Sequence, residues 1–337
     1  MAEFSIIDQF CTGIGSAHSA TDIAVGDDAA VINIPNDMRM AISVDTMVAG
    51  VHFYPDAAPE TIAHKLLAVN LSDMAAMGAL PKWATMTLTA PDVDTDWLAA
   101  FSNSLDSLAK HYNVQLIGGD TTQGQLNLSM QIMGLLPKSK ALTRNGAKIG
   151  DDVYVSNTIG DAALALRCLQ LEKHVSEKPI ENQKAFKGLL KPNLLRFLEQ
   201  PNPQLELGVQ LLNVANSCID VSDGLLADLS HIAQKSAVSI EIDVAKLPLS
   251  TVYQDYIAQG GNPDLALTGG DDYQLAFSAP IETRDAITRI SGELNIPITR
   301  IGCVTKRNAD DSLLSLRSNG GAYQLSSNAG YQHFKPD

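Results

Sequence analysis

The sequence predicts an α/β protein of two domains. The chain has 337 residues, more than a single domain usually contains, and 45% of them are hydrophobic while 18% are charged, so a sizeable core is available. Apolar runs of strand length alternate with longer runs of helical spacing along the whole chain. A polar loop with four basic residues, PKSKALTRNGAKIGDD, interrupts this alternation near residue 140. We therefore expect domains over residues 1–140 and 141–337.

The first half reads as a short helix within residues 1–20, followed by alternating strands and helices. In an expected helix at 61–77, apolar residues recur at helical spacing, and Gly78 directly after it is suited to end a helix. The other expected elements of this half are a helix at 94–112 and strands at 29–34, 40–45, 82–89, 114–117 and 126–136.

The second half shows the same alternation. The expected strands are 152–156, 217–221, 239–244, 265–268, 273–278 and 299–304. The expected helices are 161–171, 205–213, 225–236 and 281–294, with a helical connection at 248–261 and a surface loop at 172–181. Gly-Gly-Asp occurs twice, at 118–120 and 269–271, each time after an expected strand, which is weak evidence that the halves are related.

Composition and charge argue against several classes of partner. The net charge of −14 makes a nucleic acid or an anionic membrane an unfavourable partner. No apolar run reaches the ~20 residues of a membrane span, and the N-terminus MAEFSIIDQF lacks the basic and apolar regions of a signal peptide. The four cysteines are scattered without a CxxC pair and are best interpreted as reduced thiols. We expect a soluble, cytoplasmic protein.

Aspartates at the ends of apolar runs are the main candidates for chemistry. Five of them follow expected strands and two more lie nearby: Asp45, Asp120, Asp220, Asp223 and Asp271, with Asp28 and Asp73. Any one of them could simply make a turn. Together, and without His or Cys clusters, they favour a site for Mg²⁺ and a polyphosphate. The sequence contains no GxxxxGK[ST], GxSxG or HExxH motif, so P-loop, nucleophile-elbow and zinc-protease chemistry are set aside.

The chain contains seven notable motifs, which are GDDAA (26–30), SVDTMVAGVHF (43–53), NLSDMAAMGALPKWA (70–84), GGDTT (118–122), TRNGAKIGDDVYVS (143–156), DVSDGLLADLSHIA (220–233) and GGDDYQL (269–275). In this order, they resemble the motifs of the thiamine-monophosphate kinases, a family of the AIR synthase superfamily of ATP-using enzymes. The resemblance covers nearly the whole chain.

The resemblance implies a fold and a reaction. The expected fold is the AIR synthase-like one, in which an N-terminal sheet domain binds metal and ATP and pairs with its copy in a homodimer, and a C-terminal α/β domain follows. The expected reaction moves the γ-phosphoryl group of ATP, the co-substrate, to thiamine monophosphate with the help of several Mg²⁺ ions. The acceptor is a phosphate monoester with a second pKa of about 6, so no general base is required. We accordingly expect no dedicated catalytic base.

The resemblance also implies roles for individual residues. The metal positions are Asp28, Ser43, Val44, Asp45, Asp73, Asp120, Asp220 and Asp223. The ATP positions are Gly119, Asp120, Arg144 and Ser222. The thiamine positions are His52, Asp271 and Tyr331. Val44 could bind metal only through its carbonyl, Asp271 stands where relatives often have Glu, and Tyr331 stands where some have Trp.

Alternative interpretations stay open at this point. Arg144 could be a solvated linker residue, His52 a structural histidine and Tyr331 a packed residue of the tail. Another superfamily enzyme, such as AIR synthase, which closes an imidazole ring with ATP, is the first alternative. Selenophosphate synthetase and the hydrogenase-maturation relative fit less well, because the chain lacks the glycine loop of the former and the C-terminal Cys of the latter. The remaining alternative is a non-catalytic protein that binds Mg²⁺ and a nucleotide.

Overall fold

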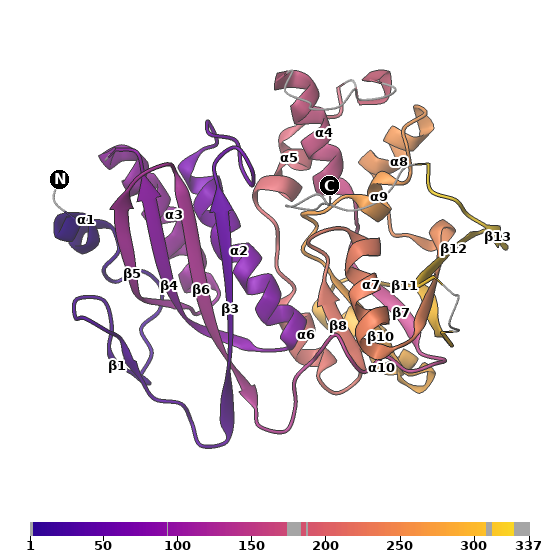
Figure 1. Ribbon diagram of the computed structural model, residues 1–337, viewed down its shortest axis with the longest axis horizontal. Helices are drawn as coiled ribbons and strands as arrows, with labels where there is room; N and C mark the ends of the chain where they lie inside the picture. Colours follow the sequence, from indigo (N-terminus) through magenta and orange to yellow (C-terminus); the bar gives the residue numbers. More distant parts are fainter. Residues whose placement is uncertain (1–2, 93, 174–182, 187, 308–311, 327–337) are drawn as a thin grey trace. The chain divides into compact units, whose positions relative to one another are not determined.

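The computed structural model describes residues 3–92, 94–173, 183–186, 188–307 and 312–326 (Figure 1). The chain divides into two compact units, Met1–Ala141 and Leu142–Asp337, and each is described by itself. Both units combine helices with β-sheet, which confirms the predicted α/β class. Within the described ranges, no helix has both the length and the apolar character needed to cross a membrane.

A four-stranded sheet forms the centre of the first unit. Its order is β3 (Met38–Val48), β6 (Asn127–Pro137), β4 (Leu80–Ala90) and β5 (Gln115–Gln123). Only the β4–β5 pair is parallel, because α3 (Thr95–His111) connects these two strands and returns the chain to the same end of the sheet. The remaining elements before α2 are α1 (Glu3–Phe10) and a separate antiparallel pair, β1 (Thr21–Ile23) with β2 (Val31–Ile32).

Helix α2 (Pro59–Met77) is the buried element of this unit. It contacts β3, β6 and β4 of the sheet and also α3, which itself contacts β5 (Figure 1). Pro59 occupies the first turn, where a missing N–H is harmless, and Gly78 ends the helix with φ of 70°, as predicted. Because α2 is enclosed by the sheet and α3, apolar residues surround it on nearly all sides.

The opposite face of the sheet is only partly covered. At one end, Trp83 is completely buried in a small apolar cluster, and its indole N–H donates to the Thr21 hydroxyl of β1 at 2.8 Å. At the other end, Ile42 and Val44 of β3 are 58% and 61% exposed. These two side chains share a face because they are two residues apart on one strand.

A seven-stranded sheet forms the centre of the second unit. Its order is β13 (Gly321–Ala322), β12 (Leu314–Ser318), β9 (Ser239–Asp243), β11 (Ile298–Thr305), β7 (Asp152–Ser156), β10 (Leu275–Ala279) and β8 (Ser217–Asp220). All neighbouring pairs are antiparallel except β12 with β9. All residues of β7, β8 and β10 are buried, so these strands lack the alternating burial of a half-exposed sheet.

Helices pack around this sheet and complete the core. They are α4 (Asp161–Lys173), α5 (Pro192–Glu199), α6 (Leu205–Leu211), α7 (Leu225–Ser236), α8 (Thr251–Ala258), α9 (Leu265–Thr268) and α10 (Arg284–Leu294), with short 3₁₀ turns at Gln183–Phe186, Val244–Lys246 and Ile281–Thr283. Helix α7 packs on β8, β9, β10 and β12, and α10 packs on β11 and α6.

Several element predictions were wrong. Residues 265–268, expected as a strand, form the one-turn helix α9, since four apolar residues carry no usable period. The first Gly-Gly-Asp lies inside β5, and Asp45 lies inside β3, so neither aspartate ends its strand. The second Gly-Gly-Asp follows a helix. Helix α5 and strands β12 and β13 were not predicted, and most of the expected loop at 172–181 lies outside the described residues.

Candidate active site

Two loops of the second unit meet at one edge of its sheet. Strand β8 ends at Asp220, and the antiparallel strand β10 begins at Leu275, its register partner. The segment that leaves β8 (221–224, loop A) therefore lies beside the segment that enters β10 (269–274, loop B). The predicted residues in this region are Asp220, Ser222, Asp223 and Asp271. Antiparallel pairing of β8 with β10 brings them together.

Backbone hydrogen bonds join loop A to loop B. The Asp271 N–H donates to the Ser222 carbonyl at 2.8 Å, and the Tyr273 N–H donates to the Val221 carbonyl at 2.8 Å. A Cβ atom at Gly270 would lie 2.2 Å from the Ser222 carbonyl oxygen, so only glycine permits this approach. A change in one loop is therefore transmitted to the other.

Loop B holds two side chains in a strained backbone conformation. Asp271 and Tyr273 have φ values of 67° and 50°, a region that costs a residue other than glycine roughly 1–3 kcal/mol and is frequent at functional sites. The Tyr273 hydroxyl donates to the Asp271 carboxylate at 3.1 Å. This contact fixes the direction of the carboxylate that we predicted to recognise the thiamine portion of a substrate.

The buried Asp228 accepts hydrogen bonds from the backbone of loop A. Its Oδ2 atom accepts the backbone N–H groups of Ser222, Asp223 and Gly224 at 3.0, 3.1 and 3.2 Å, and the residue is only 2% exposed. Burial and the charge of Asp223 raise the pKa of Asp228 to about 7, against the opposing effect of the three N–H groups. We did not predict this residue. The sequence did contain a signal for it, because Asp228 stands among leucines in the first turns of the helix expected at 225–236.

Asp272 supports loop B in a similar way. The Gly160 N–H, just before α4, donates to both of its carboxylate oxygens at 3.0 and 2.8 Å. Burial raises the pKa of Asp272 well above its ordinary value, and the neighbouring carboxylates of Asp161 and Asp271 act in the same direction. Of the two aspartates in Gly-Gly-Asp-Asp, one is thus half-buried beside Tyr273 and the other is a buried structural group.

The predicted ATP residue Arg144 is exposed on a loop that Ser236 holds in place. The Ser236 hydroxyl donates to the Arg144 carbonyl at 3.2 Å and accepts the N–H groups of Gly146 and Ala147 at 3.1 and 3.2 Å. Gly146 has φ of 137°, and a Cβ there would lie 2.3 Å from the Asn216 carbonyl oxygen. The backbone of this loop is therefore fixed, although the Arg144 side chain is exposed.

In the first unit, three predicted metal residues lie on the side of β3 that faces α2. The Ser43 hydroxyl donates to the Asp73 carboxylate near the end of α2, and Asp45 shares the face of Ser43 by the strand period. One turn before Asp73, the fully buried Asn70 has an Oδ1 atom that accepts no hydrogen bond within the described part of the chain. This group offers oxygen ligands only.

Asp120 lies at the other edge of the same sheet. Its strand β5 and the strand β3 of Asp45 are separated by β6 and β4, which places the two aspartates roughly 14 Å apart at the usual strand spacing. Within this unit they therefore do not share one ion. Gly119 is required by packing, because a Cβ there would lie 1.9 Å from the Met86 carbonyl oxygen of β4. Val44 directs its side chain to solvent on the opposite face from Asp45.

The remaining predicted residues have different surroundings. The His52 Nδ1 atom accepts the Val48 N–H at 3.0 Å, and the buried Lys65 donates to the His52 carbonyl at 3.3 Å. Asp28 is exposed, and its N–H donates to the Asp27 carboxylate at 2.9 Å. Tyr331 lies outside the described residues.

No preformed metal centre is present in the described ranges. Nowhere among them do three or more His, Cys, Asp or Glu side chains approach closely enough to hold a cation. The predicted ligands are nevertheless carboxylate, hydroxyl and carbonyl oxygens, and Asn70 adds a buried oxygen acceptor for which the described residues provide no donor. This donor chemistry suits Mg²⁺ and not zinc.

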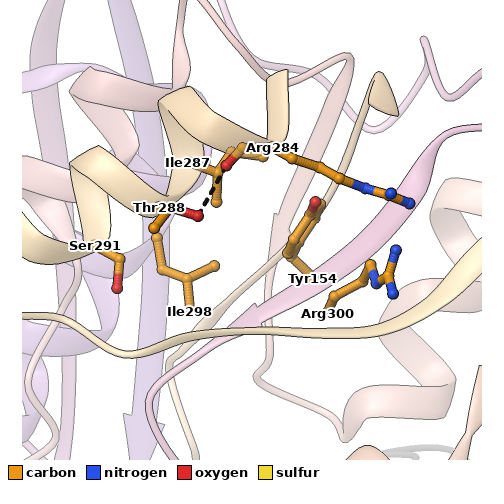
Figure 2. Close-up of a pocket in the computed structure, with 7 residues that line it drawn as sticks. All are labelled: Tyr154, Arg284, Ile287, Thr288, Ser291, Ile298 and Arg300. Atoms are coloured by element: carbon orange, nitrogen blue, oxygen red, sulfur yellow. Dashed lines mark hydrogen bonds between the residues drawn. The ribbon is translucent and has the colours of Figure 1, made fainter. Parts of the chain in front are cut away.

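A cavity of about 270 Å³ lies elsewhere in the second unit, beside α10 (Figure 2). Its walls are formed by Tyr154, Arg284, Ile287, Thr288, Ser291, Ile298 and Arg300, none of which we predicted to be functional. Its two charged residues, Arg284 and Arg300, both donate hydrogen bonds to Asp152, which does not line the cavity.

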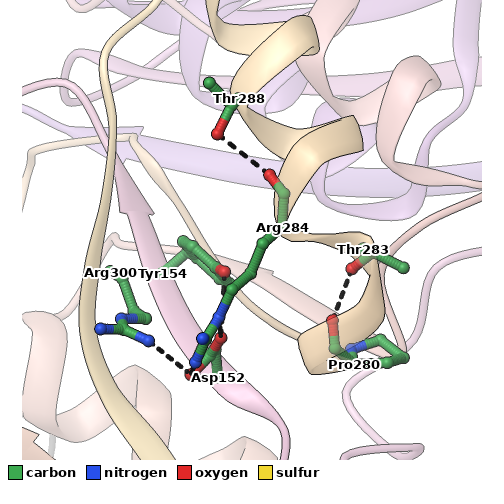
Figure 3. A network of polar contacts seen from close by, with 7 residues as sticks. All are labelled: Asp152, Tyr154, Pro280, Thr283, Arg284, Thr288 and Arg300. Atoms are coloured by element: carbon green, nitrogen blue, oxygen red, sulfur yellow. Dashed lines mark hydrogen bonds and ion pairs between the residues drawn. The ribbon is translucent and has the colours of Figure 1, made fainter.

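Asp152, at the start of β7, ties β7 to α10 and β11 (Figure 3). It accepts two hydrogen bonds from Arg284, at 2.5 and 2.9 Å, one from Arg300 at 3.3 Å and one from the Tyr154 hydroxyl at 3.2 Å. Its register partner is Ala279, at the end of β10 remote from loop B. This network is structural and lies at the opposite end of the strands from loops A and B.

Comparisons with known proteins agree with this architecture. Models for the N-terminal and C-terminal domains of AIR synthase related proteins match residues 26–136 and 148–314. The chain is 43% identical to thiamine-monophosphate kinase of Escherichia coli K12 over 98% of both chains, and 39% identical to that of Haemophilus influenzae over 99% and 98%. The crystal structure of thiamine-monophosphate kinase from Stenotrophomonas maltophilia matches with a TM-score of 0.77 at 38% identity, covering 91% of this chain and 93% of that one.

A further solved structure, AaThiL complexed with AMPPCP and TMP, matches with a TM-score of 0.74 at 30% identity and covers 92% of both chains. The fold and the two domain matches define an AIR synthase-related protein. Within that class, the chain belongs to the thiamine-monophosphate kinase family. The resemblance read from the seven motifs is thereby confirmed.

Proposed function

We propose that this protein transfers the γ-phosphoryl group of ATP to thiamine monophosphate, giving thiamine diphosphate and ADP. The observation that carries the proposal is the joined pair of loops A and B, which places Ser222, Asp223 and Asp271 at one sheet edge in a chain that belongs to this kinase family. The related AaThiL was complexed with AMPPCP, an analogue of ATP, and with TMP, which supports the same pair of substrates here.

The proposed chemistry needs charge and position more than proton transfer. The attacking phosphate is largely deprotonated near neutral pH, so it requires no general base. Two anions must approach each other in line, and at an effective dielectric of 20 two unit charges ~4 Å apart repel by roughly 4 kcal/mol. Residues that fix both phosphates and offset their charge therefore supply most of the catalysis.

Mg²⁺ is the proposed cofactor because the donor set offers only oxygen. The residues that would hold it are Asp28, Ser43, Val44, Asp45, Asp73, Asp120, Asp220 and Asp223. When bound, the metal would neutralise phosphate charge and align the transferred group. The separation of Asp45 from Asp120 across the sheet supports several ions over one. Ser43 holds Asp73 in place before any metal arrives, because its hydroxyl donates to that carboxylate.

The proposed substrate contacts divide between ATP and thiamine monophosphate. ATP would contact Gly119, Asp120, Arg144 and Ser222. Thiamine monophosphate would contact His52, Asp271 and Tyr331. For Asp271, the support is its fixed direction beside Tyr273, which suits recognition of the cationic thiazolium. For Arg144, the support is a fixed loop that leaves an exposed guanidinium for phosphate.

The assembly and the cell compartment belong to the proposal as well. The first unit would bind metal and ATP and would form a homodimer through its sheet, for which the exposed Ile42 and Val44 on β3 provide support. The protein would act in the cytoplasm, without a nucleic-acid or membrane partner, which agrees with its net charge of −14.

The decisive experiment measures ADP formation with thiamine monophosphate, with free thiamine and without acceptor. We expect turnover with thiamine monophosphate and little with thiamine, whose hydroxyl would need a base. Asp271→Ala should raise KM for thiamine monophosphate more than it lowers kcat. Comparable kcat/KM for both acceptors would contradict the proposed acceptor, and a pure loss of kcat would contradict the role of Asp271. Nucleotide binding without turnover would favour the non-catalytic alternative.

A further inference from the structure

Loop A contains a run of backbone donors that already has an acceptor. The N–H groups of Ser222, Asp223 and Gly224 converge on Oδ2 of Asp228, at 3.0, 3.1 and 3.2 Å. Consecutive N–H groups at the start of a helix are the arrangement that many nucleotide-binding proteins use to hold a phosphate. Here loop A leads into α7, and the internal carboxylate of Asp228 takes the position that a phosphate oxygen takes in those proteins.

The occupied donors restrict how loop A can contact a nucleotide. The N–H groups of Ser222, Asp223 and Gly224 are bound to Asp228, which is 2% exposed and so is not displaced without opening the core, and the Val221 N–H donates to the Gln274 carbonyl. The side chains of Ser222 and Asp223 are half-buried and so remain accessible to a ligand, whereas the N–H groups of loop A do not. Gly224, with φ of 119°, permits the turn, because a Cβ there would lie 2.8 Å from the Thr268 carbonyl oxygen.

The same contacts reach loop B. The carbonyl of Ser222, whose N–H is bound to Asp228, accepts the N–H of Asp271 at 2.8 Å. Asp228 thus holds the residue to which loop B is attached. Displacement of loop A would move the proposed ATP contact and the proposed thiamine contact together.

We propose that Asp228 is a positioning residue for nucleotide binding. Its carboxylate occupies the N–H groups of Ser222, Asp223 and Gly224, so that Ser222 and Asp223 contact the metal–nucleotide complex through their side chains and not through these N–H groups. This inference rests on the proposed function only in that the ligand is a metal-bound nucleoside triphosphate.

Three substitutions of Asp228 distinguish the effect of where its acceptor oxygen lies from the effect of its negative charge. Asp228→Asn retains an oxygen at the same distance, and one oxygen suffices because all three N–H groups bind Oδ2. Asp228→Glu retains the carboxylate but displaces it by one methylene. Asp228→Ala leaves a cavity in which formate can take the place of the lost carboxylate. Asp152→Asn is the matched control, a buried aspartate of the same unit at the remote end of the sheet.

The primary measurement is the Kd of AMPPCP with Mg²⁺, obtained by isothermal titration calorimetry. We expect Asp228→Asn to bind within about threefold of the wild type, and Asp228→Glu to lose about tenfold or more, since a misplaced acceptor leaves buried N–H groups unsatisfied. Asp228→Ala should bind weakly and recover in formate, with KM for ATP following the same order. Asp152→Asn should lower Tm and leave the Kd unchanged.

The outcomes separate the inference from the function. Wild-type affinity in Asp228→Glu, or equal losses in Asp228→Asn and Asp228→Glu, would overturn the positioning role, and the comparison of these two variants stands even where Asp228→Ala does not fold. A wild-type protein that binds AMPPCP but forms no ADP with thiamine monophosphate would overturn the proposed function alone. A wild-type protein that binds no nucleotide would overturn both.

Discussion

At the scale of single residues, aspartates with similar sequence contexts have quite different surroundings. Asp223 is half-buried in loop A, Asp228 is buried beneath it, and Asp73 accepts a hydrogen bond from a serine of the neighbouring strand. All three lie in motifs that the sequence made visible. Residue type and order predicted which segments matter, but the division into exposed and supporting carboxylates depends on contacts between distant segments.

Asp73 is the clearest single-residue test of metal-assisted chemistry. Asp73→Asn should remove most of the Mg²⁺-dependent turnover, about tenfold or more, because the amide keeps an acceptor for Ser43 but loses the charge that a hard cation requires. The measurement is ADP formation over a range of Mg²⁺ concentrations, together with Tm. Asp106→Asn in α3 is the control, since Asp106 binds Gly15 and Lys110 and has no proposed ligand. Near-normal turnover of Asp73→Asn would contradict its role.

At the scale of elements, long segments with a clear hydrophobic periodicity or a clear terminating residue were predicted well. Helices α2 and α7 and strand β7 lie where we expected them, because α2 has a clear C-terminal glycine and β7 has three consecutive apolar residues at its centre. The short helix α9 and the length of β5 were not predictable in this way. Strand β5 continues through Gly-Gly-Asp because β4 pairs with it along that stretch, and pairing between distant segments leaves no local signal.

The two glycines of β5 offer a matched pair for testing that pairing. Gly119→Ala should lower the free energy of unfolding by about 1–3 kcal/mol or more, because its Cβ would lie 1.9 Å from the Met86 carbonyl oxygen. Gly118→Ala should cost less, because its nearest neighbour would be the Thr85 methyl carbon at 3.7 Å. Urea unfolding followed by circular dichroism measures both. Equal losses would show that chain entropy, and not the contact with β4, makes these glycines necessary.

The contacts of Asp152 predict how stability depends on pH. Burial raises the pKa of Asp152, but the hydrogen bond and charge of Arg284, aided by Arg300 and Tyr154, outweigh burial and hold the pKa below its ordinary value. A carboxyl with a depressed pKa stabilises the fold above its unfolded pKa, about 3.9, and this contribution is lost as pH falls through the folded value.

The corresponding experiment compares Tm of the wild type with that of Asp152→Asn between pH 7 and pH 3. The difference should stay constant down to about pH 5 and shrink below pH 4, because Asn does not titrate. Asp106→Asn is measured in parallel as a comparison. Asp106 also has a lowered pKa, but its partner Lys110 is more exposed than Arg284 and Arg300. A difference that grows as the solution becomes acidic would contradict the assignment.

At the scale of the whole molecule, the α/β class was predictable from composition and alternation. The mainly antiparallel pairing within the two large sheets was not predictable in this way. It brings Asp220, Asp223 and Asp271 together, whereas Asp45 and Asp120 lie on the two opposite edge strands of the first sheet. The first unit also leaves one end of a sheet face uncovered, with Ile42 and Val44 more than half exposed. Apolar exposure of this kind is typical of a surface that another protein covers.

Ile42→Lys tests whether that surface holds two copies together. A buried, unpaired lysine is costly at an apolar interface, so the variant should shift the population from dimer to monomer. Sedimentation velocity measures the shift, with Ile281→Lys in the second unit as a control of comparable chemistry. A wild-type protein that sediments as a monomer, or an Ile42→Lys variant that remains a dimer, would contradict the proposed interface.

The position of the tryptophans gives the two units different optical signatures. The chain contains two tryptophans, Trp83 and Trp97, and both belong to the first unit, where Trp83 is fully buried and Trp97 stacks on Phe101. Indole emission therefore reports on the first unit, whereas far-ultraviolet circular dichroism reports on the backbone of both. If the units unfold separately, the two signals give transitions that do not coincide, and a single emission curve would describe only half of the protein.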